Sequence, residues 1–510
     1  MTAGALLQLQ NGITDRMAFL TLNPQITHFK SVYKKYTNFS TEFINKLPSS
    51  SNGNLSFDKD TKITFEIPRD GDAIRDIYLT FDLPDIYSDS NYQFQWIKRI
   101  GEYIVKDVSL QIDTNQSIDK HYGEWFHAYS ELNYDEGKKK GYYRMIGNIP
   151  ELYDPANAPG NGGSYPNNTM YAPALPAIPS IINRKIYLPL IFWFNKMSSL
   201  SFPLIAIQKT IIYITFNFRR LQDLYTVVDY GIGKTNKRIK PTTTAHYIGN
   251  YLSPQDINKS SLNINPRLEI NNIFLDNIER TRFALSSHEY LITQLQCINK
   301  IESTSKTLSI DLKNFNKPIT QLIYMIRRSD MENINEWSNY TNWNIQDIPP
   351  YSNGYINPYG NALSLTTNNI KYYKNKNLLK SAIIRIENYE ITTGDTVDND
   401  NPTNTNLSGK DNLFFNLVTN FNTNRNIPHE GIYTYSFALN NTDLQPSGAI
   451  NFSAITNKNL ILNLTDLNPN ETINNSTGAT YTYNYVINVF AVNYEILKIM
   501  GGMVDVSSAN

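Results

Sequence analysis

Short runs in which β-branched and aromatic residues alternate in part with polar ones recur along the whole chain. Seven of these runs are predicted to be β-strands, because strand side chains point alternately to opposite faces and these residue types pack well on a pleated surface. The runs cover residues 61–67, 75–83, 210–218, 307–312, 382–391, 459–467 and 481–492. The pattern predicts a protein built mainly of β-sheet.

Helical periodicity is scarce. Apolar residues recur at spacings of three and four only in residues 27–36 and in residues 121–132, HYGEWFHAYSEL. The apolar face of the second segment would consist of Trp125, Phe126, Tyr129 and Leu132. Such a face is suited to packing against one end of a β-sandwich. Stretches rich in Asn, Gly, Pro and Ser separate the strands and are predicted to be long surface loops; they cover residues 154–180, 235–265, 337–367 and 394–410.

The chain contains an internal repeat. Residues 73–81 (AIRDIYLTF) resemble residues 318–326 (PITQLIYMI), and Tyr78 matches Tyr324 at an offset of 246 residues. Turn residues precede both copies, so each repeat begins as a strand, a connection and a second strand. We expect Tyr78 and Tyr324 to lie in equivalent strands.

Two further pairs of segments follow in the same order. Residues 186–207 and 432–453 share the offset of 246, and residues 269–279 and 485–495 match at an offset of about 216. Two tandem copies of one domain with about eight strands explain all three pairs. The fold class we predict is all-β, with two tandem eight-stranded antiparallel jelly-roll sandwiches, long loops and few short helices.

Length and charge limit the classes of function and of binding partner that we expect for this chain. A chain of 510 residues is expected to form two or more domains. The 46 Lys and Arg residues balance the 46 Asp and Glu residues, so the formal net charge is zero. Binding nucleic acid or an anionic membrane by charge requires a positive field, so we expect protein partners and self-association instead.

Cysteine content and hydropathy indicate where the chain folds. Cys297 is the only cysteine, which excludes an internal disulfide and favours folding in a reducing compartment. The first residues lack the basic region and apolar run of a signal peptide. The most apolar stretch, residues 186–218, is interrupted by Asn195, Lys196 and Lys209, too often for a membrane span. We expect a soluble protein made in the cytosol.

Candidate catalytic and metal-binding groups are sparse. His121, Glu124 and His127 are spaced at i, i+3 and i+6, which does not match the i, i+4 histidine pair of a helical zinc site. Cys297 has no acid or base beside it in sequence, so a buried thiol is expected. The glycines of residues 160–163 (GNGG) lie inside a predicted loop. In a phosphate-binding loop, the glycines would directly follow a strand. We predict no catalytic, cofactor or metal site, and no enzyme.

Two groups of aromatic residues call for different interpretations. Tyr187, Phe192, Trp193 and Phe194 enter a predicted strand and are expected to pack in the core. The loop of residues 335–360 could instead stack on sugars, which would make the chain a carbohydrate- or receptor-binding protein. The aromatic residues of that loop are Trp337, Tyr340, Trp343, Tyr351, Tyr355 and Tyr359.

Glycosylation motifs are numerous, but the chain contains 65 asparagines and produces such motifs by chance. The Asn-x-Ser/Thr motifs include those at Asn38, Asn54, Asn115, Asn258, Asn339, Asn406, Asn451, Asn463 and Asn470. In a cytosolic product these sites would stay unmodified by the secretory pathway.

Several longer segments resemble a known family. They are GALLQL with NPQITHFKSVYKKYTNFS, then GYYRMIGN, LPLIFWFNKMSSLSFPLIAIQ, ERTRFALSSHEYLITQLQ and GIYTYSFALNNTDLQPSGAINFS. In this order, from residue 4 to about 503, they resemble the double jelly-roll major capsid proteins of nucleocytoplasmic large DNA viruses. The chain departs from the family after QPSG, where it has Ala449 and Ile450 in place of the common Cys or Ser.

The resemblance implies a domain plan. Residues 1–25 would form an N-terminal arm, residues 26–292 the first jelly roll, residues 293–306 a connector, residues 307–495 the second jelly roll, and residues 496–510 a C-terminal tail.

The resemblance also implies a function. The chain would be a major capsid protein that forms homotrimers, and these pseudo-hexagonal capsomers would tile an icosahedral shell. Its partners would be itself, neighbouring capsomers, minor capsid and penton proteins and, indirectly, the inner membrane, with no direct nucleic acid and with glycans on some outer loops. It would be made and assembled in the host cytoplasm and reside in the virion capsid.

Overall fold

The computed structural model describes most of the chain. The described residues are 2–10, 19–49, 53–88, 91–113, 116–167, 178–229, 238–253, 255–256, 259–342, 377–387, 389–392, 413–429, 431–465 and 483–507. The chain divides into two compact units, Met1–Phe39 and Ser40–Asn510. We describe each by itself.

The first unit contains helix α1 (Ala3–Gln10) and an extended segment. The helix predicted for residues 27–36 is wrong, since these residues have no helical hydrogen bonding. Every side chain described in residues 19–38 is exposed, and Phe29 is 99% exposed. A periodic apolar pattern forms a stable helix mainly when its apolar face packs on a core, and a ten-residue helix alone is marginal in water.

The second unit begins with a jelly roll of two four-stranded sheets. One sheet has the order β1-β13-β4-β8, formed by β1 (Phe39–Lys46), β13 (Arg267–Leu275), β4 (Ala73–Leu83) and β8 (Arg184–Pro189). The other has the order β3-β9-β6-β7, formed by β3 (Thr61–Glu66), β9 (Ile212–Phe218), β6 (Val105–Ile112) and β7 (Gln116–Tyr122). Two smaller sheets flank them, made of β2 (Asn54–Ser56) with β12 (Ser261–Asn263), and of β5 (Tyr92–Trp96), β10 (Tyr225–Asp229) and β11 (Arg238–Ile239).

The second jelly roll repeats this plan. Its first sheet has the order β14-β22-β16-β19, formed by β14 (His288–Ser303), β22 (Tyr485–Met500), β16 (Pro318–Arg328) and β19 (Ile432–Ser436). Short strands β20 (Ile450–Asn451) and β23 (Met503–Ser507) pair with β16 and β22. Its second sheet has the order β15-β21-β17-β18, formed by β15 (Thr307–Asp311), β21 (Lys458–Leu464), β17 (Leu379–Ile386) and β18 (Tyr389–Glu390).

The matching strand orders confirm the duplication. Tyr78 lies in β4 between β13 and β8, and Tyr324 lies in β16 between β22 and β19. Tyr187 faces Thr80 in the first roll, whereas Tyr433 faces Tyr324 in the second. The registers therefore differ by two residues, and an even shift leaves each side chain on its original face of the sheet. Each of the seven predicted segments contains a strand, but residues 382–391, predicted as one strand, hold the end of β17 and the antiparallel strand β18.

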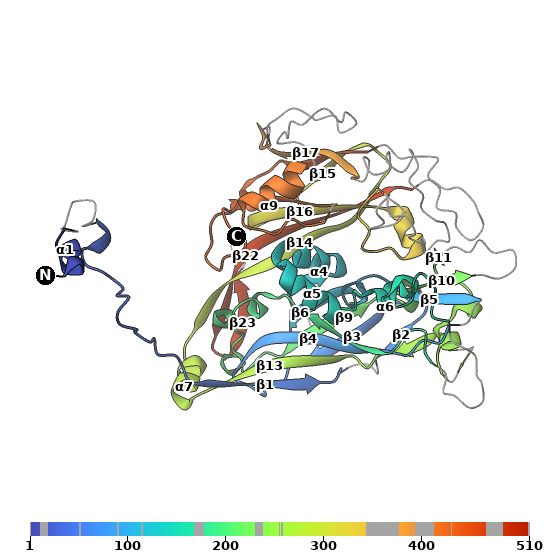
Figure 1. Cartoon of the computed structure of the whole chain (residues 1–510), viewed down its shortest axis with the longest axis horizontal. Helices are drawn as coiled ribbons and strands as arrows, with labels where there is room; N and C mark the ends of the chain where they lie inside the picture. Colours follow the sequence, from blue (N-terminus) through green and yellow to red (C-terminus); the bar gives the residue numbers. More distant parts are fainter. Residues whose placement is uncertain are drawn as a thin grey trace. The chain divides into compact units, whose positions relative to one another are not determined.

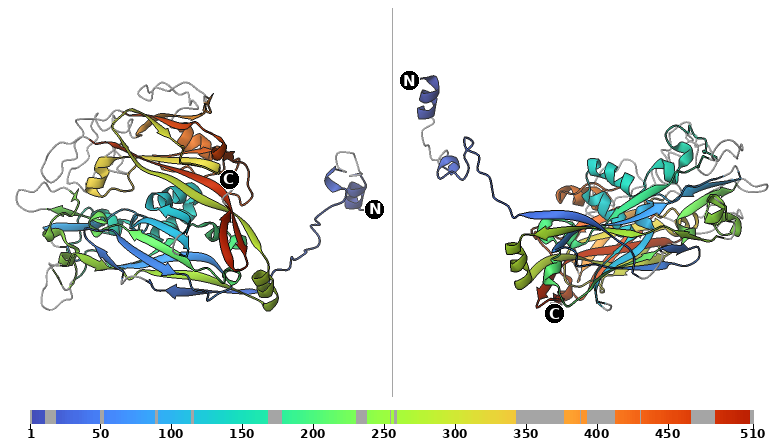
Figure 2. Two further views of the ribbon diagram at one scale, coloured as in Figure 1. Left: turned by 180° about the vertical axis from the view of Figure 1, so that it is seen from behind. Right: turned by 90° about the horizontal axis from the view of Figure 1, so that it is seen from below.

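The two longest strands cross the expected domain limits. β14 occupies most of residues 293–306, which were expected to be a connector, and β23 lies in the expected C-terminal tail. β14 and β22 have 16 residues each and run side by side in both views of Figure 2. Pairing satisfies the backbone groups that a connector or a tail would leave to solvent.

Helices α4 (Gly123–Asn133) and α5 (Glu136–Met145) lie between the two jelly rolls (Figure 1). The α-helices of the second unit are α3 (Ile100–Tyr103), α4 (Gly123–Asn133), α5 (Glu136–Met145), α6 (Pro150–Tyr153), α7 (Asn277–Leu285) and α9 (Thr419–Asn422). α4 lies between the rolls rather than at one end, and it starts at Gly123, where an added Cβ would meet the Val105 carbonyl oxygen at 2.6 Å. Among the described residues, no helix is long and apolar enough to cross a membrane.

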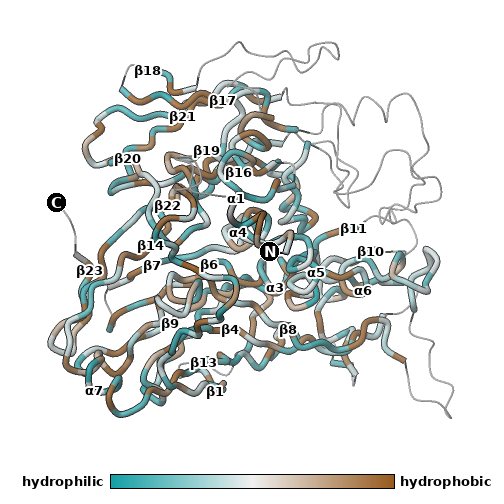
Figure 3. Tube along the Cα trace, turned by 60° about the vertical axis from the view of Figure 1, so that its left-hand side comes forward, coloured by the Kyte–Doolittle hydropathy of each residue, from teal (hydrophilic) through white to brown (hydrophobic). Residues whose placement is uncertain are grey.

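Burial shows which sheet is central. β21 alternates between buried and partly buried residues, whereas β16 and the first half of β22 are buried on both faces. A strand covered on both sides contains mostly apolar residues in succession, and β16 and β22 lie next to each other in the hydropathy-coloured trace of Figure 3. The sheet containing β22 is therefore a middle layer, with the second sheet on one face and the first jelly roll on the other.

The aromatic residues predicted for the core lie there. Phe192, Trp193 and Phe194 are at most 1% exposed, and Tyr187 is partly buried. The Trp193 ring meets Phe202 edge-on at 5.8 Å between ring centroids. This packing confirms the structural interpretation of the segment.

Candidate functional site

The junction between the two jelly rolls is the part of the described structure where charged and aromatic side chains are most densely buried. The first roll supplies α3, α4 and α5, and the second supplies the 3-10 helix η8 (Ser329–Ile334) with the residues that follow it. Three groups of polar contacts lie here. They include contacts that join one roll to the other.

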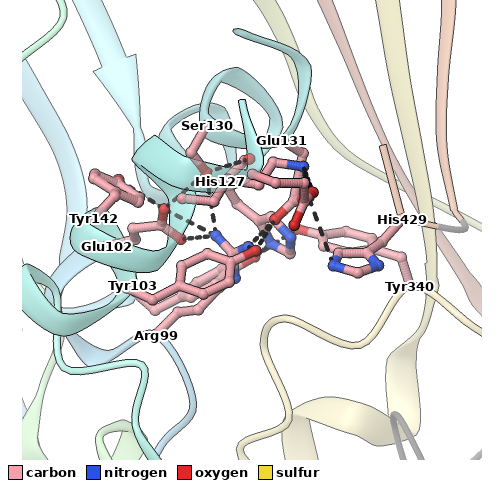
Figure 4. A network of polar contacts seen from close by, with 12 residues as sticks. Arg99, Glu102, Tyr103, His127, Ser130, Glu131, Tyr142, Tyr340 and His429 are labelled. Atoms are coloured by element: carbon pink, nitrogen blue, oxygen red, sulfur yellow. Dashed lines mark hydrogen bonds and ion pairs between the residues drawn. The ribbon is translucent and has the colours of Figure 1, made fainter. Parts of the chain in front are cut away.

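The first group is centred on Arg99, which is 3% exposed (Figure 4). Its Nη1 donates to both carboxylate oxygens of Glu102, at 3.1 and 3.0 Å, and to Ser130 Oγ at 3.2 Å. Its Nη2 donates to Glu131 Oε1 and, at 3.0 Å, to the Tyr143 hydroxyl. Arg99 has a φ of +56°, a conformation that costs a non-glycine residue about 1 kcal/mol or more. The contacts of the guanidinium hold it there.

The two carboxylates of this group respond differently to burial. Burial raises the pKa of Glu102, although Arg99 opposes the change. Burial would also raise the pKa of Glu131, but the charges of Arg99, His429 and Lys139 outweigh it and lower that pKa. Burial acts to lower the pKa of Arg99, and the two carboxylates reverse this, so the guanidinium stays charged.

Glu131 connects this group to the second jelly roll. Its Oε2 lies 3.1 Å from Lys139 Nζ in α5 and 3.6 Å from His429 Nε2, which belongs to the loop before β19. Figure 4 shows His429 approaching Glu131 from the side opposite Arg99. The carboxylate of Glu131 therefore has cations from both rolls as neighbours when His429 is protonated.

The second group is a chain of three rings. The Tyr103 hydroxyl lies 2.7 Å from His127 Nδ1 and 3.0 Å from the hydroxyl of Tyr340, which belongs to the second roll. All three residues are buried. Burial, with the nearby positive charge of Arg99, lowers the pKa of His127 well below its ordinary value. A neutral His127 can accept the hydrogen bond from Tyr103.

The third group surrounds Trp337. The guanidinium carbons of Arg219 and Arg327 lie 4.3 and 5.1 Å from the centroid of the Trp337 ring, and the indole Nε1 donates to the Asp223 carbonyl oxygen at 2.9 Å. Arg219 Nη2 lies 2.8 Å from Glu124 Oε1. Cation–π contacts shielded from water are worth up to about 2 kcal/mol each. This group links the β-sheet of the first roll to the segment after η8.

The residues considered as metal ligands have separate partners. His121 lies at the end of β7 and its Nε2 is 3.0 Å from Asp119 Oδ2. Glu124 pairs with Arg219, and His127 with Tyr103. Within the described parts of the chain, no three His, Cys, Asp or Glu side chains come together in a group that could hold a metal ion.

The other candidate groups have structural surroundings. Cys297 lies in β14, and burial raises the pKa of its thiol, with a further effect of Glu124. A protonated thiol is a poor nucleophile. The glycine-rich residues 160–163 form turns, in which the Gly163 amide donates to the Ala156 carbonyl oxygen at 2.9 Å.

The sugar-stacking interpretation is wrong for two of its residues. Trp337 and Tyr340 are 6% and 2% exposed and use their rings to join the two rolls. A sugar would have no access to either face. Trp343, Tyr351, Tyr355 and Tyr359 lie outside the described residues.

Sequence analysis missed the charged residues of the junction. The spacing of Glu124 and Glu131 could have revealed them. These residues lie seven positions apart and so share a face of α4 with apolar neighbours. Charged residues on an apolar face point to a buried ion pair. Their partners Arg99, Arg219 and Arg327 come from distant segments, and the sequence offers no comparable signal for them.

Comparisons with known proteins fit this architecture. A family profile described as the major capsid protein N-terminus matches residues 27–276, and one described as the large eukaryotic DNA virus major capsid protein matches residues 279–504. The chain belongs to the major capsid proteins of large eukaryotic DNA viruses. Family membership makes it a structural component of a virion capsid, like its relatives.

Individual relatives span the whole chain. The major capsid proteins of Phaeocystis pouchetii virus and of Paramecium bursaria Chlorella virus 1 are each 29% identical to it, and each alignment covers 100% of both chains. PBCV-1 VP54, in a structure fitted into a reconstruction of the virophage Sputnik, superimposes with a TM-score of 0.64 at 26% identity, covering 95% of this chain and 100% of VP54. The Faustovirus major capsid protein, at 13% identity and a TM-score of 0.61, shares the fold.

Proposed function

We propose that three copies of this major capsid protein form a capsomer with a pseudo-hexagonal outline, and that such capsomers tile the outer shell of an icosahedral virion. Each chain would supply two of six jelly rolls. The observation that carries the proposal is the junction just described, in which the buried hydrogen bond between Tyr103 and Tyr340 and the contacts of Trp337 with Arg219 and Arg327 join two sandwiches of the same strand order.

A rigid junction suits this role because the angle between the two rolls sets the outline of the trimer. A heterologous interface repeated around a threefold axis closes on itself and leaves no free copy of either surface. The zero net charge of the chain lowers the repulsion between copies. We propose that the activity is geometric and that the chain catalyses no reaction.

The remaining partners belong to the same proposal. We keep the domain limits 1–25, 26–292, 293–306, 307–495 and 496–510 as proposed working limits. The N-terminal arm would contact neighbouring capsomers or minor capsid and penton proteins at the capsomer base, and the inner membrane would be reached only through such proteins. Glycans on outer loops would require accessible asparagines, a condition that Asn339 does not meet because it is fully buried. Synthesis in the host cytoplasm accords with a chain that has one cysteine.

Mass measurement in solution tests the capsomer. We expect a homotrimer at micromolar concentration without nucleic acid, and we expect it to survive high salt, because apolar burial is screened far less than surface charge. A stable monomer at that concentration would contradict the proposal. A trimer that dissociates in high salt would show that charge pairs hold it together instead.

A further inference from the structure

A cavity of about 770 Å³ opens between the two jelly rolls. The first roll contributes α4, α5 and the segment after β8, and the second contributes β14, β22 and the loop of residues 441–444. Cavities of this size that combine apolar walls with a few converging polar groups are where proteins usually bind ligands. The junction contacts described above lie outside it, so the cavity needs its own explanation.

Arg425 lies on the wall of this cavity and is held there by its backbone. Its amide donates to the Asn420 carbonyl oxygen at 2.9 Å, and the next amide, of Asn426, donates to the Leu132 carbonyl oxygen of α4 at 3.1 Å. The Nε and Nη1 atoms of Arg425 are buried, and they have no hydrogen-bond partner in the described part of the chain. Burial lowers the pKa of this guanidinium to about 10.

Lys196 provides a second cation on the same cavity. Its Nζ donates to Thr293 Oγ1 at 2.7 Å. The residue keeps contact with solvent, yet the surrounding walls desolvate its ammonium group and lower its pKa to about 8, an effect that Asp119 opposes and the charge of Arg425 reinforces. Two cations that repel each other therefore line one cavity.

The carboxylates on the cavity wall are engaged elsewhere. Asp76 accepts from Asn271 Nδ2 at 3.0 Å and lies 3.6 Å from Arg75, and Asp443 accepts from Asn440 Nδ2 at 2.7 Å. In the described ranges, neither forms an ion pair with Arg425 or Lys196. Arg425 is partly buried, and its buried Nε and Nη1 donors have lost water without gaining a carboxylate, which is unfavourable in an apolar setting. An anion supplied from outside would remove this cost.

Apolar side chains surround the two cations. Trp125 and Trp193 are buried in the walls, while Met197, Leu291 and Leu444 stay 46%, 42% and 40% exposed at the rim. A small inorganic anion would leave this rim uncovered. A peptide that carries a carboxylate next to apolar side chains would cover both parts.

We propose that this cavity binds an acidic segment of a partner polypeptide, with Arg425 and Lys196 contacting its carboxylate and the Met197, Leu291 and Leu444 rim covering its flanking apolar side chains. A guanidinium can hold a carboxylate through two parallel hydrogen bonds, which fixes its orientation. The site goes beyond the capsomer proposal, because it concerns what a single chain binds and requires no second copy.

The test uses the full-length protein and a fluorescein-labelled six-residue peptide that contains two glutamates and two leucines. We expect this peptide to bind at least about tenfold more tightly than the same peptide with glutamines, because a charge-assisted hydrogen bond is worth that factor or more. Arg425→Gln and Lys196→Gln should each weaken binding by about tenfold. Arg282→Gln and Lys313→Gln serve as matched controls, since these side chains are 75% and 65% exposed, lie outside the cavity and should leave binding unchanged.

A stability measurement separates binding from a structural role. Without peptide, Arg425→Gln should melt at the same temperature as the unmodified protein or higher, because it removes an unpartnered buried charge. Equal binding of the glutamate and glutamine peptides would overturn the proposal. Unchanged binding by both cavity variants would also overturn it. A third contrary outcome is that the trimer excludes the peptide and that Arg425→Gln weakens trimerisation, which would assign the cavity to a second copy of the chain.

Discussion

At the scale of single residues, the junction shows how charge can be buried. Arg99 is bonded by two carboxylates, a serine and a tyrosine, so almost all of its donors are satisfied. Pairs of this kind add little net stability compared with an apolar core, but losing one partner leaves a charge buried without compensation. Residues in this cluster should therefore tolerate change poorly.

Replacing Arg99 tests this directly. We expect Arg99→Ala to lower the free energy of unfolding by about 3 to 5 kcal/mol, because it leaves two buried carboxylates unpaired. Arg75 is the control: its side chain is 44% exposed and lies 3.6 Å from Asp76, so Arg75→Ala should cost less than about 1 kcal/mol. Denaturant titration measures both. If the two variants lose the same free energy of unfolding, the buried Arg99 cluster contributes no more to stability than an exposed ion pair.

His127 makes stability depend on pH. Because burial lowers its pKa in the folded protein, the unfolded chain binds a proton first as the pH falls through about 6.5. The unfolded state then holds more protons, so stability decreases with falling pH, by about 1.4 kcal/mol per pH unit until the folded pKa is reached. The lowered pKa of Glu131 acts in the same direction at more acidic pH.

The measurement compares unfolding free energies at about pH 7.5 and about pH 5.5. The unmodified protein should lose about 1 kcal/mol or more over this interval, and His127→Asn should lose less. The asparagine can still accept a hydrogen bond from Tyr103. An unchanged pH dependence in His127→Asn would assign the effect to other groups.

At the scale of elements, the segment after η8 connects the two rolls. The Trp337 ring contacts two arginines that belong to different rolls. Asn335 Nδ2 donates to the carbonyl oxygens of Gln222 and Tyr225 at 2.7 and 2.8 Å. The apolar core of the first roll also continues through Ile323 and Phe490 into the second. The sheet containing β16 and β22 therefore contributes one face to the core of the first roll and the other face to a separate core of the second.

Replacing Trp337 tests most directly how strongly the two rolls are coupled. We expect Trp337→Ala to cost about 3 to 5 kcal/mol and to make the unfolding of the two rolls separable by calorimetry. Trp337→Phe keeps most of the packing and should cost about 1 kcal/mol for the lost hydrogen bond to Asp223. A single sharp transition in Trp337→Ala, at the temperature of the unmodified protein, would mean that other contacts couple the rolls.

At the scale of the whole molecule, the arm and the jelly rolls differ in burial. Both described apolar cores begin after residue 54, and the side chains described in residues 19–38 are all exposed. Exposed apolar residues in such number mark a surface meant for other chains. The proposed role of the arm in assembly therefore predicts that its removal leaves folding intact.

Truncation separates assembly from folding. A chain lacking residues 1–38 should fold and melt within about 2 °C of the full-length protein, since it loses no core contact. Particle assembly with the virus's other capsid proteins, followed by electron microscopy, should be impaired. A fall in melting temperature well beyond that range would show that the arm stabilises its own chain.

The sequence alone indicated seven strand-containing segments, the duplication and the family of this protein, but it missed β14, which it assigned to a connector. Period-two patterning and β-branched residues are local signals, and the repeat offset of Tyr78 and Tyr324 reports strand equivalence without any structure. The apolar run of β22 from Tyr485 to Val492, interrupted only by Asn488, also contained the information that both its faces are covered.

Only the tertiary structure decided what happens between the rolls. The apolar period in residues 27–36 was not enough to make a helix, because these side chains are exposed and bury no apolar face. Trp337 and Tyr340 looked like loop residues open to sugars, yet contacts with Arg219 and Tyr103, more than a hundred residues earlier in the chain, bury them. Likewise, the partners of Arg99 and the unpartnered Nε and Nη1 of Arg425 depend on which segments lie next to each other in the fold. No local pattern of residue types specifies which distant segments come into contact.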